Sequence, residues 1–323
     1  MTVVDLTTTP APEPAGLLDG LPRRVGLTLA ELRHAARLAG GAPLPFDDAA
    51  TAGGVAPGGR PADRLADRLG EEATGAAGPA YDRIVAGLPD PASSLGRRGL
   101  AQGTALDAGL AGALGLLATP RLAVDLDLAT PTGRVRSWHR QRGPAVATLS
   151  TADGVLFEVA WCHASQWTDE LARVATVPEL PTGPEEPDER ARRTVLLPFE
   201  LADAATEAQT AGRHDVLPAL LDQAGPVTDV QGRALERAEA LAALSGLAAA
   251  THGRLRALAT DVTRTDALPV ATVAWLLGDR GWLALEPASG ATATLRLAPV
   301  RPVDLGGALA PALAAVTSAG AAS

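Results

Sequence analysis

Apolar and polar residues alternate in two segments of the chain. Residues 122–128 place leucine or valine at every second position, with Asp125 and Asp127 between them. Residues 155–161 repeat this alternation, with Glu158 at a polar position. Because successive side chains of a β-strand point to opposite faces of its sheet, the pattern predicts half-buried strands.

Helical spacing and start signals predict helices around these strands. Thr28 followed by Glu31 matches a capping box, in which the hydroxyl and the carboxylate satisfy early backbone N–H groups. Thr104 with Asp107 three residues later predicts another helix start, and a leucine stripe follows it. We therefore expect helices from Thr28 onward and over residues 104–117, 168–175, 232–247 and 303–316.

The order of elements occurs twice along the chain. An offset of 138 residues aligns the Arg-Gly turn at residues 142–143 with the one at residues 280–281. An offset of 169 residues aligns Glu31 with Glu200, each at the start of a predicted helix. Each half therefore reads as a β-type run entering a helix, a further apolar helix, four mostly antiparallel strands and a closing helix.

These elements predict an α+β fold, with a central, mostly antiparallel β-sheet flanked by helical bundles in two pseudo-symmetric halves. We expect a flexible N-terminal tail over residues 1–23, a first half over 24–177, a linker over 178–193 and a second half over 194–318. The two halves together form one domain. Residues 47–61, rich in Gly, Ala and Pro, read as a mobile loop.

Composition excludes several kinds of chemistry. The 323 residues include no lysine, so mechanisms that need a P-loop or Schiff-base amine are ruled out. Cys162 is the only cysteine and cannot form an internal disulfide or a paired-thiol metal site. The five histidines show no metal-binding spacing. The sequence predicts no cofactor and no metal.

Charge and hydropathy indicate the cellular location of the protein. The net charge of −9 disfavours non-specific binding to nucleic acid or to anionic lipid. Residues 1–22 lack a basic segment followed by an apolar run, and the longest apolar stretches are shorter than the ~20 residues that cross a bilayer. We therefore expect a cytoplasmic protein with no membrane insertion.

Catalytic candidates are scattered. Cys162 and His163 are adjacent on a predicted strand, so they point to opposite faces and read as a buried thiol beside a surface imidazole. A small-molecule enzyme using dispersed residues such as His139, His163 or Asp169 remains an alternative, which a deep cleft with convergent polar groups would favour. The absence of a catalytic motif predicts that the chain is not an enzyme.

One predicted strand, residues 133–143, carries an unusual density of arginine. Alternation places five large side chains on one face: Arg134, Arg136, Trp138, Arg140 and Arg142. Arginine and tryptophan are enriched at protein interfaces, so this stripe is the best candidate recognition surface. Two alternatives are a solvated edge strand, whose arginines deter aggregation, and a nucleic-acid-binding or regulatory module.

Several passages resemble the EspG family of type VII (ESX) secretion-associated proteins. They are LTLAELRHAARLAG, RRGLAQGTALDAGLAGALGLLATPRLAVDLDL, GRLRALATDV, and VATVAWLLGDRGWLALEP with the closing helix. The likeness spans about residues 25–316 and follows the same order in both halves.

The resemblance implies a non-enzymatic cytosolic chaperone. Such proteins bind the PPE subunit of PE–PPE secretion substrates, keep the pair soluble and deliver it to the secretion machinery. The family's contact region maps onto the arginine stripe, and its second-half equivalent onto residues 278–282, which include Asp279, Arg280 and Trp282. The arginine density and the loop near Asp47 depart from the family, so a related substrate is also compatible. We expect a monomer or a weak homodimer.

Overall fold

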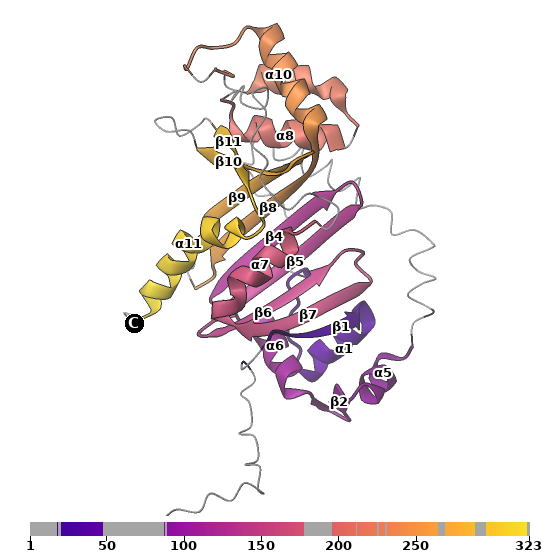
Figure 1. The fold of residues 1–323 in the computed structure, drawn as a ribbon. Helices are drawn as coiled ribbons and strands as arrows, with labels where there is room; N and C mark the ends of the chain where they lie inside the picture. Colours follow the sequence, from indigo (N-terminus) through magenta and orange to yellow (C-terminus); the bar gives the residue numbers. More distant parts are fainter. Residues whose placement is uncertain are drawn as a thin grey trace, which may run out of the picture.

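The protein is described from a computed structural model, which covers residues 18, 21–47, 87, 89–177, 196–210, 212–224, 226–229, 231–263, 269–287 and 295–321. It has an α+β fold built on a nine-stranded, wholly antiparallel sheet (Figure 1). The sheet order is β1-β7-β6-β5-β4-β8-β9-β10-β11.

The strands of this sheet and of a small two-stranded sheet alternate with the helices. In the main sheet they are β1 (Arg23–Thr28), β4 (Leu122–Thr130), β5 (Gly133–Arg142), β6 (Ala145–Thr151), β7 (Leu156–His163), β8 (Thr251–Asp261), β9 (Pro269–Gly278), β10 (Gly281–Pro287) and β11 (Leu295–Val300). The small sheet pairs β2 (Ala101–Gln102) with β3 (Ala105–Leu106). The described α-helices are α1 (Leu29–Leu38), α5 (Pro91–Arg97), α6 (Ala108–Ala118), α7 (Trp167–Ala175), α8 (Phe199–Thr210), α9 (Leu217–Gln223), α10 (Arg237–Ala250) and α11 (Asp304–Ala321).

The two halves of the chain meet in one sheet through β4 and β8. These strands pair antiparallel from Leu122 opposite Asp261 to Ala129 opposite Arg254. On each side of this pair, three further strands follow in chain order, β5 to β7 and β9 to β11. The predicted arrangement of four antiparallel strands and a closing helix in each half is therefore confirmed.

The predicted Arg-Gly turns join equivalent strands. The turn at Gly143 connects β5 to β6, and the turn at Gly281 connects β9 to β10. Both glycines have positive φ, of 57° and 114°, a backbone region that L side chains rarely adopt. Because β4 and β8 run antiparallel, the two turns lie at opposite ends of the sheet.

One face of the sheet is covered by the two closing helices. Leu122, Val124, Leu126 and Leu128 of β4 point to this face and are almost fully buried. They pack with Leu171 of α7 and with Leu305 of α11. The helices α7 and α11 come from different halves of the chain and contact each other. We call this the helix-covered face; it faces the viewer in Figure 1.

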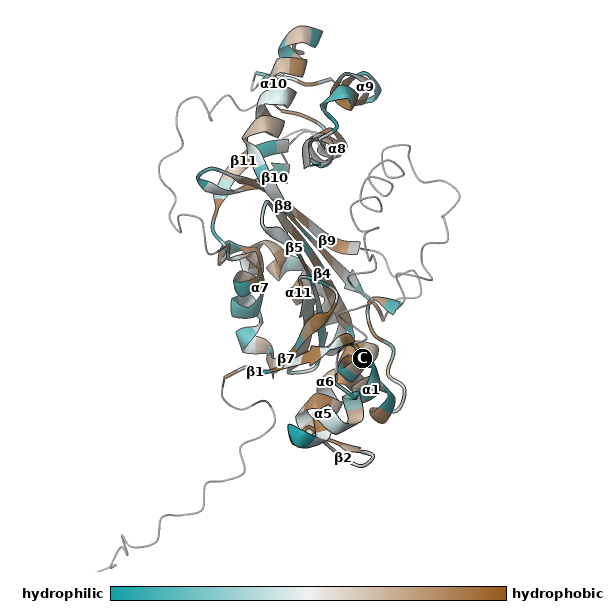
Figure 2. Cartoon of the chain, turned by 90° about the vertical axis from the view of Figure 1, so that its right-hand side faces the viewer, coloured by the Kyte–Doolittle hydropathy of each residue, from teal (hydrophilic) through white to brown (hydrophobic). Residues whose placement is uncertain are grey.

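The opposite face is covered only toward its two ends by the described helices. The helices α1, α5 and α6 pack over β1, β7 and β6, while α8, α9 and α10 form a separate bundle over the other end (Figure 2). Leu27, Leu149 and Val159 lie under the first group, and Leu285 lies beside the second. The centre of this face, on β4, β5 and β8, retains exposed side chains.

One of the two predicted helix starts is confirmed and the other is wrong. The capping box at Thr28 is confirmed, with Glu31 N–H donating to Thr28 Oγ1 at 3.2 Å and Thr28 N–H donating to Glu31 Oε2 at 2.8 Å. The predicted helix start at Thr104 is wrong. The short strand β3 lies there, and Asp107 is itself the N-cap of α6, because its carboxylate accepts from Leu110 N–H at 2.9 Å.

Two further expectations are corrected. The interpretation of residues 133–143 as an edge strand is wrong, because β5 pairs with β4 on one side and β6 on the other. The repeat also breaks near Leu196: β1 pairs with β7, whereas Leu196 forms an isolated bridge to Thr228. Most of the predicted tail (residues 1–17, 19 and 20), nearly all of the predicted loop (residues 48–61) and the whole predicted linker (residues 178–193) lie outside the described residues.

Gly306 allows α11 to approach α7 closely. A Cβ added at Gly306 would lie 2.6 Å from Cγ2 and 2.9 Å from Cβ of Thr168, which is closer than real Cβ atoms come. We predict that Gly306→Ala lowers the free energy of unfolding by about 1–3 kcal/mol, the usual cost of overpacking. Denaturant unfolding of the purified chain measures this.

The adjacent Gly307 provides the matched control. Nothing lies within 4 Å of a Cβ added there, so Gly307→Ala is expected to leave stability unchanged or to raise it by up to about 1 kcal/mol through helix propensity. Equal losses for the two variants would contradict the close packing of α7 and α11.

Candidate protein-binding surface

The arginine stripe lies on the sheet face opposite α7 and α11. Asp125 and Asp127 of β4 stand directly opposite Trp138 and Arg136 of β5, and antiparallel partners share a face. The alternation predicted for β5 is therefore confirmed. Its other face, however, is not unusual, because Ser137, His139 and Gln141 are buried on the helix-covered face.

Arg134 is neutralised by an aspartate that the sequence analysis did not connect with it. Its Nε and Nη2 donate to Oδ1 and Oδ2 of Asp127 at 2.6 and 2.5 Å. Burial acts to raise the pKa of Asp127, but the hydrogen bonds and charge of Arg134 outweigh it, and the pKa of Asp127 is lowered. This bidentate ion pair fixes the side chains of Arg134 and Asp127 against the sheet.

Arg140 is also paired with an aspartate, Asp125, through one nitrogen. Its Nη1 donates to Asp125 Oδ1 at 2.5 Å and to the backbone oxygen of His139 at 3.1 Å. Arg140 is only 8% exposed, whereas Asp125 is on the surface. Two of the four stripe arginines are therefore part of the sheet's own polar framework.

Arg136 and Arg142 are the exposed arginines of the stripe. Neither forms an ion pair within the described part of the chain. They lie apart, because Arg136 stands in the middle of the sheet opposite Asp127, while Arg142 ends β5 and lines a shallow apolar hollow along α6. The structure does not bring them into one site.

Trp138 lies at the border between the covered and the uncovered parts of this face. Its ring centroid is 5.7 Å from that of Phe46, and Phe46 lies 5.2 Å from Phe157. One side of Trp138 thus packs against the helix group of the first half. The side chain remains partly exposed toward Asp125.

The second half completes the surface with side chains of β8 and β9. Leu258 of β8 stands opposite Asp125 and is 39% exposed, and Thr272 of β9 stands opposite Leu258 and is exposed. We define the open face as the side chains that remain accessible at the centre of this side of the sheet: Asp125, Asp127, Arg136, Trp138, Arg256, Leu258, Thr260 and Thr272.

The residues predicted at the second-half turn lie elsewhere. Asp279 and Arg280 are exposed at the tip of the β9–β10 hairpin, and Asp279 contacts His252 Nε2. Trp282 is only 4% exposed and donates its indole N–H to the backbone oxygen of Ala175 at 2.8 Å. Because Trp282 belongs to the core under α7, we leave it out of the proposed contact surface.

His139 is a structural residue of the helix-covered face. The indole N–H of Trp167 donates to His139 Nδ1 at 3.0 Å, and Nε2 lies 3.0 Å from Ser137 Oγ. Since an indole nitrogen only donates, Nδ1 accepts and Nε2 carries the proton. Burial, assisted by the charges of Arg173 and Arg140, lowers the pKa of His139 to about 3, so the imidazole is neutral at pH 7.

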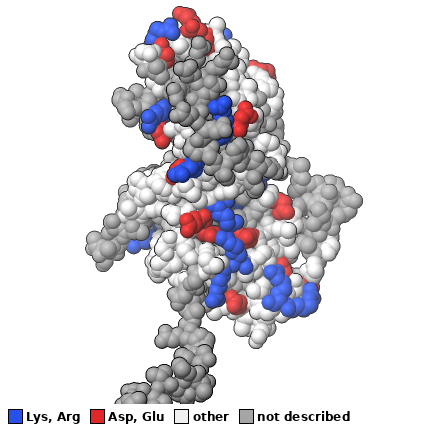
Figure 3. Space-filling model, in the orientation of Figure 1, with Lys and Arg blue, Asp and Glu red and all other residues white. Residues whose placement is uncertain are grey.

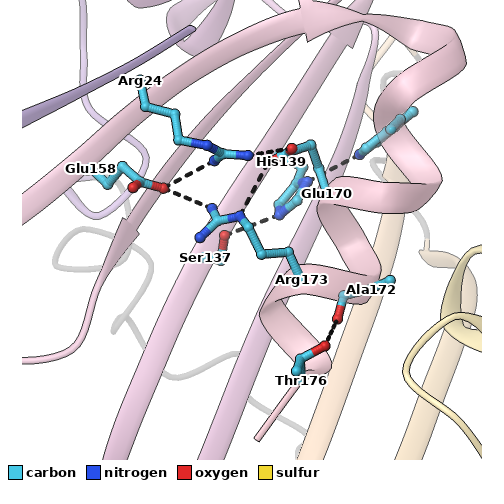
Figure 4. Close-up of polar contacts among 9 residues, drawn as sticks. Arg24, Ser137, His139, Glu158, Glu170, Ala172, Arg173 and Thr176 are labelled. Carbon is cyan, nitrogen blue, oxygen red and sulfur yellow. Dashed lines mark hydrogen bonds and ion pairs between the residues drawn. The ribbon is translucent and has the colours of Figure 1, made fainter. Parts of the chain in front are cut away.

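A closed ring of charges lies beside His139 (Figure 4). Glu158 Oε1 accepts from Arg24 at 3.2 Å and from Arg173 at 2.7 Å, and Glu170 contacts the same two arginines. Two guanidinium groups and two carboxylates balance, and they tie β1 and β7 to α7. Arginine and acidic side chains lie side by side on this face (Figure 3).

The dispersed catalytic candidates do not converge. His139 is enclosed and fully hydrogen-bonded, His163 is exposed and caps a 3-10 turn through Ser165, and Asp169 is exposed on α7. Cys162 is 2% exposed, and burial raises the pKa of its thiol to about 11. The prediction of a buried thiol beside a surface imidazole is confirmed.

Searches for other kinds of site are negative for the described residues. Within them, no group of three or more histidine, cysteine, aspartate or glutamate side chains is placed to hold a metal ion. No helix in the described part of the chain is long and apolar enough to span a bilayer.

Comparison with known proteins gives one kind of match. No protein-family model and no curated protein matches the chain. Among solved structures, it is similar to the type VII secretion system chaperone EspG5 of Mycobacterium tuberculosis, solved in complex with a PE25–PPE41 dimer. The TM-score is 0.49 at 15% identity, covering 89% of this chain and 95% of that chain. None of these comparisons places the chain in a family.

The depressed pKa of His139 makes stability depend on pH. In the unfolded chain a histidine has a pKa near 6.5. Between that pH and about pH 3, the unfolded state therefore binds a proton at His139 that the folded state does not bind. We predict that the free energy of unfolding falls by about 2 kcal/mol through this residue alone between pH 7 and pH 5. Denaturant unfolding at several pH values measures the slope.

The test is the difference between two histidine variants. His139→Gln is expected to flatten the slope between pH 7 and pH 5, whatever its effect on stability at pH 7. His214→Gln, at an exposed position, is expected to keep it. An unchanged slope in His139→Gln would show that His139 does not titrate as its burial implies.

Proposed function

We propose that this chain is a non-catalytic cytosolic adaptor that binds a type VII (ESX) secretion substrate of PE/PPE type on its open face, keeps it soluble and delivers it for secretion. The observation that carries the proposal is the exposed centre of the sheet, bordered by two helix groups. Leu258 stands there among polar side chains, and an apolar anchor within a polar frame is typical of a protein contact surface.

The resemblance of several sequence passages to EspG proteins supports the kind of partner. Those passages include the parts of β4, β8 and β9 that build the centre of the sheet. The resemblance implies that such proteins cover an apolar helical tip of the pair, and an exposed apolar helical end would associate with other chains unless it were covered. The same surface is also compatible with a related helical substrate in place of a PPE protein.

The two alternative functions are less well supported by the same contacts. An enzyme would need polar groups that converge in a cleft, whereas His139, His163 and Asp169 are separated. A nucleic-acid-binding surface would need free cations, whereas Arg134 and Arg140 are paired with aspartates.

Co-expression with a PE–PPE pair from the same genome tests the proposal. We predict that the wild-type chain retains the pair through affinity and size-exclusion chromatography, and that Leu258→Asp lowers the retained amount at least tenfold. The reason is that a buried, unpaired carboxylate at the contact costs several kcal/mol.

Val303→Asp is the matched control. Val303 is 59% exposed and precedes α11 on the other side of the sheet, so this variant is expected to retain the pair. Thermal unfolding of each variant excludes loss of the fold. Equal retention by Leu258→Asp and wild type would refute binding at the open face. Salt-sensitive retention of DNA or RNA, abolished by joint Arg136→Ala and Arg140→Ala substitution, would favour the nucleic-acid alternative instead.

A further inference from the structure

The open face combines charged side chains with exposed uncharged ones. On β4 and β5 it presents Asp125, Asp127 and Arg136, and on β8 and β9 it presents Leu258 and Thr272 beside Arg256. Any partner that covers the centre of the sheet therefore meets both charged and uncharged side chains. The partner's contact surface must therefore place charged groups over the charged side chains and apolar groups over Leu258.

Arg136 is a cation of the open face that forms no ion pair with any described residue. The carboxylate of Asp127, its cross-strand neighbour, is occupied on both oxygens by Arg134. Asp125 is held by Arg140. No carboxylate among the described residues lies within ion-pairing distance of Arg136, although its charge contributes to lowering the pKa of Asp127.

The geometry fits a single helical end. Leu258 lies two strands away from Arg136 and two residues further along, by the pairing of Asp125 with both Leu258 and Trp138. With strands about 4.8 Å apart and residues advancing about 3.4 Å, the two backbones are separated by about 12 Å. An α-helix with its side chains is about 10–12 Å wide, so one helix can contact both positions.

We propose that the bound substrate presents one helical end whose acidic side chain pairs with Arg136 while an aliphatic side chain of the same end packs on Leu258. This inference rests on the proposed function and specifies the substrate's chemistry and orientation. A carboxylate would be drawn to Arg136 because the pairs Arg134–Asp127 and Arg140–Asp125 leave its charge uncompensated. In the shielded centre of an interface, such a charge-assisted contact is stronger than on an exposed surface.

Affinity measurements with a recombinant PE–PPE pair from the same genome test the orientation. We expect Arg136→Glu to weaken binding at least tenfold. Replacing the acidic residue of the substrate's helical end by arginine should weaken wild-type binding similarly and restore binding to Arg136→Glu. Restoration in the double variant shows direct pairing, which loss of fold in either protein cannot mimic.

Two other arginine variants separate this contact from general charge. Arg33→Glu, at an exposed position on α1, is expected to change affinity less than twofold. A loss in Arg142→Glu equal to that in Arg136→Glu would overturn the inference, because it would show attraction to positive charge along the whole of β5.

The outcomes distinguish the two proposals. If wild type binds the pair and Leu258→Asp does not, but Arg136→Glu binds normally, the proposed function stands and the acidic contact is refuted. If no PE–PPE pair binds the wild-type chain, the proposed function fails, and the inference about its substrate fails with it.

Discussion

The antiparallel pairing of β4 with β8 is the constraint on which the rest of the structure depends. It joins the two halves edge to edge, from Leu122 opposite Asp261 to Ala129 opposite Arg254. Because paired residues share a face, the apolar positions of both halves must lie on one side of a continuous sheet. The closing helices α7 and α11 then cover that side together. The charged positions of β4 are left on the other side, between two helix groups that each serve one end.

Much of the fold could be predicted because its signals are local. Period-two alternation in β4, the capping box at Thr28 and the glycine turns at Gly143 and Gly281 each depend on a few neighbouring residues. The start of α6 was misplaced for the same reason: Asp107 can act either as the N3 partner of an earlier cap or as the cap itself, and the β2–β3 pairing decides between them.

The site was only partly predictable because it depends on long-range register. Alternation placed the stripe on one face, but it could not show that Asp127 would engage Arg134 or that β5 would be an inner strand. The second-half equivalent depends on the same kind of long-range relation. A two-fold relation between halves puts equivalent turns at opposite ends of the sheet, and Trp282 turned toward the core. The exposure of Leu258 could not be predicted from the sequence, and single exposed leucines are common on protein surfaces.

The internal ion pairs reduce the free positive charge of the open face. Four unpaired arginines in one stripe would attract nucleic acid and anionic surfaces without discrimination. Pairing Arg134 and Arg140 with aspartates removes that attraction and orders the strands, while Arg136 and Leu258 remain accessible at a separation of about one helix width. A surface with few available anchors binds through a small number of contacts. If the open face binds one partner as proposed, its affinity depends on whether that partner satisfies both anchors at once, which suits an adaptor that must release its substrate.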